Sequence, residues 1–126
     1  MSTMAQTVEN VAAAARSGVG ALREDDLARI AQATETYESL RPVPCTQCRY
    51  CMPCPHDLDI PRNMALFMDG HIFGERRMRQ SRRQYLRMDE KARAGACVQC
   101  RECEEKCPQK IEISAVMPRI HAELGE

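Results

Sequence analysis

Two runs of four cysteines, each followed directly by a proline, constrain this chain more than any other feature of its sequence. The runs read CTQCRYCMPCP and CVQCRECEEKCP; in each, the first three cysteines stand at steps of three and the fourth is displaced. The positions are Cys45, Cys48, Cys51 and Cys54 in the first run, and Cys97, Cys100, Cys103 and Cys107 in the second. The fold therefore has to form two tight cysteine loops, each ended by a residue that fixes φ and lacks a backbone donor.

Soft sulfur ligands at this spacing are typical of iron–sulfur clusters. Three thiolates at steps of three can bind one 4Fe-4S cube, and the displaced fourth is free to reach a different cube, as in two-cluster ferredoxins. We therefore predict that one cluster is bound by Cys45, Cys48, Cys51 and Cys107. The other is predicted to be bound by Cys97, Cys100, Cys103 and Cys54. Because the ligands cross between the runs, the clusters would hold the fold together.

Zinc sites and disulfide bonds are the alternative uses of these cysteines. Zinc sites usually pair two CxxC knuckles and need only four ligands, whereas this chain offers eight cysteines. Disulfides do not require a proline after the last cysteine of each run. The pattern favours two 4Fe-4S clusters, and the spacing alone leaves the alternatives open.

Length and charge narrow the class of protein. The chain has 126 residues, enough for one compact domain and too few for a large enzyme. Its formal net charge is zero, so we expect no bulk attraction to nucleic acid or to membranes. We expect neither a signal peptide nor a membrane span, because no long apolar run is present. We expect a cytoplasmic location, because a reducing compartment favours the use of cysteines in metal sites over disulfides.

Apolar periodicity predicts helices along the chain and no convincing strand. A first short helix begins near Val8 and ends at Ser17. A second, amphipathic helix carries acidic residues in its first turn and has to stop by Arg41, ahead of two prolines. Asp59 can cap a third helix with Pro61 in its first turn. The inner face of that third helix is expected to hold Met64, Phe67 and Met68.

The second half of the chain is expected to be helical as well. Gly70 and Gly74 are expected to break the chain, and a fourth helix to run from Glu75 to Glu90. A last helix tolerates Pro118 only in its opening turn. The 42 residues between the runs leave room for two helices, more than a short hairpin-bearing connection needs. The predicted fold class is all-α, a helical ferredoxin with two 4Fe-4S clusters between helical segments.

Three stretches carry a family resemblance: CTQCRYCMPCPHDLDIPRN, FMDGHIFGERR and KARAGACVQCRECEEKCPQKIEI. They resemble the C-terminal ferredoxin-like extension of the iron–sulfur aldo-keto reductases, in which a TIM barrel precedes a helical two-cluster domain. MSTMAQTVENVAAAA looks like the segment that leads from the barrel into that extension. The barrel and its aspartate, tyrosine, lysine and histidine set are absent from this sequence. Gln47 and Arg101 stand where the family more often has glycine.

We expect residues 1–44 to form an N-terminal helical segment that packs on a cluster domain comprising residues 45–126. His56 either tunes a nearby cluster or is a surface or capping histidine. The methionines are expected to pack around the clusters, because flexible thioethers fill irregular gaps. The basic segment Arg76–Arg93 is either a solvated helix face or a docking surface for an acidic redox partner.

The sequence therefore predicts an electron-transfer protein or subunit that works with a redox protein partner or a catalytic oxidoreductase subunit. No candidate nucleophile or acid–base pair indicates catalysis by this chain alone. One alternative is a non-catalytic piece of an iron–sulfur oxidoreductase, similar to the aldo-keto reductases, whose catalytic barrel is elsewhere. Another is a module whose clusters only hold the fold. Nucleic-acid binding by base stacking is not expected, because the chain has no Trp and few aromatic residues.

Overall fold

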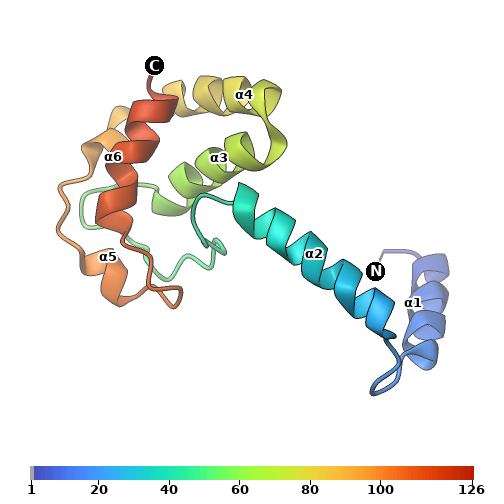
Figure 1. Cartoon of the computed structure of the whole chain (residues 1–126). Helices are drawn as coiled ribbons and strands as arrows, with labels where there is room; N and C mark the ends of the chain where they lie inside the picture. Colours follow the sequence, from blue (N-terminus) through green and yellow to red (C-terminus); the bar gives the residue numbers. More distant parts are fainter. Residues whose placement is uncertain (1) are drawn as a thin grey trace. The chain divides into compact units, whose positions relative to one another are not determined.

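The computed structural model describes residues 2–126, in which every regular element is a helix (Figure 1). This confirms the all-α prediction. By its internal contacts the chain divides into two compact units, one ending at Thr36 and one comprising Tyr37–Glu126. Among the described residues, no helix is long and apolar enough to cross a membrane.

The first unit contains α1 (Met4–Arg16) and most of α2 (Glu24–Leu40). Thr3 begins α1 with a capping box: its hydroxyl accepts from the N–H of Gln6, whose side chain accepts in turn from the N–H of Thr3. Neither α1 nor α2 contains a buried residue. The expected packing of residues 1–44 on the cluster domain stays a prediction.

In the second unit, α3 (Ile60–Phe73) forms as expected. The Asp59 carboxylate accepts a hydrogen bond from the N–H of Arg62 at 3.2 Å, and Pro61 occupies the first turn, where its missing N–H costs nothing. The residues on its inner face are buried, as predicted: Met64, Phe67 and Met68.

The prediction that Gly70 breaks the chain is wrong: Gly70 lies buried within α3. A Cβ placed on Gly70 would come within 2.6 Å of the Met78 sulfur and 3.2 Å of the Met78 Cα. The absence of a side chain at Gly70 therefore allows α3 to approach α4 (Glu75–Leu86) closely. Gly74, with φ of 77°, makes the turn between the two helices.

The fourth helix ends at Leu86, four residues before the predicted Glu90. The Arg93 guanidinium donates to the carbonyls of Leu86 at 2.7 Å and Met88 at 3.0 Å, and so satisfies carbonyl groups that a longer helix would use. Two short 3₁₀ turns, η1 (Glu90–Ala92) and η2 (Ala94–Ala96), then lead to the second cysteine run.

After the second run come the single turn α5 (Glu102–Glu105) and the last helix, α6 (Ile113–Leu124). α6 packs against α3, α4 and η2 in the second unit (Figure 1). Pro118 is the sixth residue of α6, so the expectation that it lies in the opening turn is wrong. Pro118 is tolerated there because the side chain of Gln99, in the second run, donates to the carbonyl that the proline leaves without a helical donor. Both α3 and α6 begin a few residues after a cysteine run, and this positions the two cysteine loops at their N-terminal ends.

Candidate metal centre

The first hollow contains cysteines from both runs. It has a volume of about 370 Å³, part of it open to solvent, and Cys107 of the second run lies in its wall beside three cysteines of the first. Those three are Cys45, Cys48 and Cys51. The four are the residues that the sequence assigned to one cluster.

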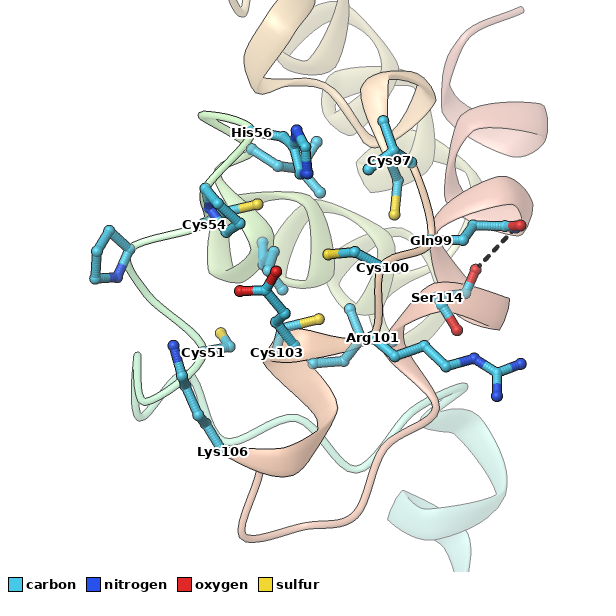
Figure 2. Close-up of a pocket in the computed structure, with 17 residues that line it drawn as sticks. Cys51, Cys54, His56, Cys97, Gln99, Cys100, Arg101, Cys103, Lys106 and Ser114 are labelled. Atoms are coloured by element: carbon cyan, nitrogen blue, oxygen red, sulfur yellow. Dashed lines mark hydrogen bonds between the residues drawn. The ribbon is translucent and has the colours of Figure 1, made fainter.

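The second hollow, of about 450 Å³, has the reciprocal composition (Figure 2). Cys54 of the first run lies in its wall with the first three cysteines of the second run, Cys97, Cys100 and Cys103. The sulfur atoms of Cys54, Cys97 and Cys100 point into the same space (Figure 2). The structure thus brings together both predicted groups of four.

Three residues line both hollows: Cys51, Ile60 and Ile113. The two isoleucines are each only 2% exposed and are the first residues of α3 and α6. They form an apolar wall between the hollows. In residues 2–126, no three His, Cys, Asp or Glu side chains lie close enough together to hold a single metal ion. The thiols are instead spread around two hollows, as ligands that each bind a different iron of a cube would be.

The two cysteine loops have positive φ at equivalent positions. In the first loop Gln47 and Arg49 have φ of 57° and 67°, and in the second Gln99 and Arg101 have 58° and 66°. Non-glycine residues in this left-handed region cost roughly 1 kcal/mol each. Backbone that alternates in handedness turns successive N–H groups to one side, which makes a concavity suited to anionic groups such as iron–sulfur clusters. The donor set and the backbone therefore fit 4Fe-4S clusters, and glycine is not needed at Gln47 or Arg101.

Burial disfavours the thiolate form of several cysteines. Burial raises the pKa of Cys103 to about 11, with smaller contributions from Glu104 and from neighbouring thiols. It also raises the pKa of Cys45 and of Cys51, and the charge of Cys107 adds to both. Iron binding therefore has to displace protons from these thiols, because the thiolate is the ligand. None of the eight cysteines, all described, forms a disulfide.

Asn63, which the sequence did not single out, joins the segments that flank the two runs. Its side chain is fully buried and donates to the carbonyls of Asp59 at 2.7 Å and Ala92 at 2.8 Å. It also accepts from the N–H of Ala94 at 2.8 Å. The sequence does show one polar residue on the apolar face of α3. It does not indicate the partners Ala92 and Ala94, which lie 29 and 31 residues away.

The remaining predicted residues are spread over the second unit. His56 is exposed and lines the second hollow. Met64 lines the first hollow, whereas Met68 and Met78 belong to the core between α3 and α4 or pack against it.

The basic segment Arg76–Arg93 is partly used within the fold. Arg77 pairs with Asp69, Arg82 donates to the carbonyl of Glu123 at 2.8 Å, and Arg93 caps α4. Three other arginines of α4 are exposed along one stripe at steps of three and four: Arg76, Arg79 and Arg83. Of these, Arg79 has a partner at the edge of ion-pair distance, Glu75 at 3.9 Å.

Comparison with known protein families matches residues 44–112, more than half of the chain, to the 4Fe-4S dicluster domain. The matched region includes both cysteine runs and the helices between them. Searches of curated proteins and of solved structures found no significant match. The match agrees with the helical fold and with the eight cysteines that surround two hollows, and two 4Fe-4S clusters are the cofactors of this domain. The chain belongs to the 4Fe-4S dicluster domain family.

Proposed function

We propose that the chain is an electron-transfer component whose two 4Fe-4S clusters are bound by crossed sets of cysteines. The first hollow would use Cys45, Cys48, Cys51 and Cys107, and the second Cys97, Cys100, Cys103 and Cys54. The observation that carries this proposal is that Cys107 lies in the first hollow with three cysteines of the first run, and Cys54 in the second hollow with three cysteines of the second run. Cys51 lines both hollows. When bound, each cluster supplies one-electron redox chemistry.

The residues of the chain would bind and separate the clusters. The thiolates would bind the irons, and backbone N–H groups of the two cysteine loops would be available to the sulfides. Ile60 and Ile113, both buried, would separate the two clusters with apolar side chains. Cys48 and Cys100, the second cysteines of the two runs, are exposed. A redox partner would therefore approach one cluster at Cys48 and the other at Cys100.

Crossed ligation can be tested by removing one exchanged cysteine at a time. In C54A, iron should be lost first from the second hollow, because the first keeps all four ligands. In C107A the first hollow should lose it instead. After anaerobic loading, alkylation of freed thiols followed by peptide mass spectrometry would report Cys100 and Cys48 separately. Preferential labelling of Cys48 in C54A, or of Cys100 in C107A, would show that each run binds its own cluster.

The partner is proposed to be a redox protein or the catalytic subunit of an oxidoreductase. The resemblance to the extension of iron–sulfur aldo-keto reductases supports a second candidate, a non-catalytic piece whose catalytic barrel is on another chain or region. A stoichiometric complex with a larger barrel protein that reduces or oxidises the clusters would favour it. Rapid electron exchange of the isolated chain with small redox proteins, and no such complex, would favour a free carrier.

A further inference from the structure

Pro118 leaves one carbonyl of α6 without its helical donor. In an α-helix the N–H of residue 118 would bond to the carbonyl of Ser114, four residues earlier, and proline has no N–H. That carbonyl accepts instead from the side-chain amide of Gln99 at 3.3 Å (Figure 2). Gln99 lies between the first two cysteines of the second run. A proline inside a helix has therefore created an anchor for a cysteine loop.

The other backbone group of Ser114 is bound to the same loop. Its N–H, at the start of α6, donates to the Glu104 carboxylate at 2.7 Å. Ser114 itself is buried at 7% exposure. One buried residue of α6 thus holds the second run on both sides of Cys100 and Cys103.

Among residues 2–126, no equivalent attachment of the first run is found. Gln47 takes the place of Gln99 in the repeated CxQCRxC pattern and has nearly the same φ, 57° against 58°. Within residues 2–126, no hydrogen bond of the Gln47 side chain is found. The two loops therefore have matching φ values at these positions but differ in their hydrogen bonds to a helix.

We propose that Gln99 and Glu104 are positioning residues that clamp the second cysteine run to α6, and that Pro118 keeps the Ser114 carbonyl free for this purpose. The inference builds on the proposed cluster sites but not on whether their ligands cross. The second run has to open before its thiolates can release iron, and opening it breaks both bonds to Ser114. The second cluster is therefore held more firmly than the first.

The test compares matched variants of the full chain, loaded with both clusters and kept anaerobic. Iron is withdrawn with a chelator, freed thiols are alkylated at intervals, and labelling of Cys48 and Cys100 is followed by peptide mass spectrometry. In Q99L, labelling of Cys100 should be faster by about fivefold, the factor that corresponds to a net hydrogen bond of about 1 kcal/mol. Q47L, which makes the same exchange in the other run, measures the general effect of replacing a loop amide on the labelling of Cys48.

P118A separates the clamp from ordinary stabilisation. It restores an N–H that can bond to the Ser114 carbonyl and compete with Gln99, while it removes a proline from a helix interior. We expect a higher thermal midpoint together with faster labelling of Cys100, two effects of opposite sense. A higher midpoint with unchanged labelling of Cys100, or equal effects of Q99L and Q47L on their own runs, would overturn the clamp. Because each run is read by its own cysteine, these outcomes are distinct from those of C54A and C107A.

Discussion

Ser81 shows how a single polar atom can limit the stability of this fold. It lies on the inner face of α4, is only 1% exposed, and its hydroxyl has no hydrogen-bond partner in the described part of the chain. A buried hydroxyl without a partner costs about 1 kcal/mol or more, and alanine is the better helix former. S81A should therefore raise the thermal midpoint by roughly 4–8 °C.

Calorimetry or circular dichroism of the cluster-loaded protein would measure the change in S81A. Arg76→Ala, at an exposed position of the same helix, is the matched control for helix propensity alone. A midpoint for S81A below that of the parent would mean that the hydroxyl has a stabilising partner, such as a buried water.

At the scale of elements, three exposed arginines form a basic stripe along α4. If Arg76, Arg79 and Arg83 steer such a partner, changing all three to Glu should slow association at low salt by about tenfold or more. Stopped-flow rates of electron exchange with an acidic flavin-containing redox protein would measure this. The difference should shrink at physiological ionic strength, where the Debye length is about 8 Å.

The control for the α4 variant carries the same change in net charge on the first unit: Arg16, Arg23 and Arg29, all changed to Glu. These three arginines are exposed too. Equal rates for the two triple variants at low salt would mean that the α4 stripe is a solvated helix face and does not steer a partner.

Local signals predicted most of these elements, and tertiary contacts explain the exceptions. The cap at Asp59 and the buried face of α3 followed from the sequence, because capping and periodicity are local. The burial of Gly70 against Met78 and the hydrogen bond from Gln99 to the Ser114 carbonyl did not follow from the sequence. Each depends on a partner from another element, so local sequence patterns predict a chain break at Gly70 and a helix start at Pro118.

The cysteine spacing placed Cys107 with the first run and Cys54 with the second, and these residues do line those hollows, although Cys51 lines both. Which thiols bind which cluster stays a prediction. Proline after the fourth cysteine and the displaced step are local features with a known structural consequence. The isoleucine wall and the Asn63 bridge could not be predicted in the same way. They arise where α3, α6 and the 3₁₀ turns meet, and no residue pattern within either run specifies that meeting.

At the scale of the whole molecule, the clusters are expected to stabilise the second unit alone. Its two cysteine loops have little regular structure, whereas the first unit contains neither cysteines nor buried helix residues. A chain that begins at Tyr37 should therefore still bind about eight irons, as the number of thiolates requires. Iron and sulfide analysis after anaerobic loading would measure this.

Removing iron with a chelator should reduce the helix content of the Tyr37–Glu126 chain, because cluster binding is coupled to folding. The full-length protein is the control for both measurements. Failure of the shortened chain to bind clusters would instead support the expected packing of residues 1–44 on the cluster domain.

The apolar wall of Ile60 and Ile113 has a consequence for the order in which electrons enter the two clusters. Apolar side chains screen charge weakly, so negative charge added on one side of the wall is felt on the other. The first electron therefore makes the second harder to add, and the two midpoint potentials belong to the pair rather than to either site. Even with two chemically identical clusters, the molecule would therefore accept its two electrons one at a time, at two different potentials.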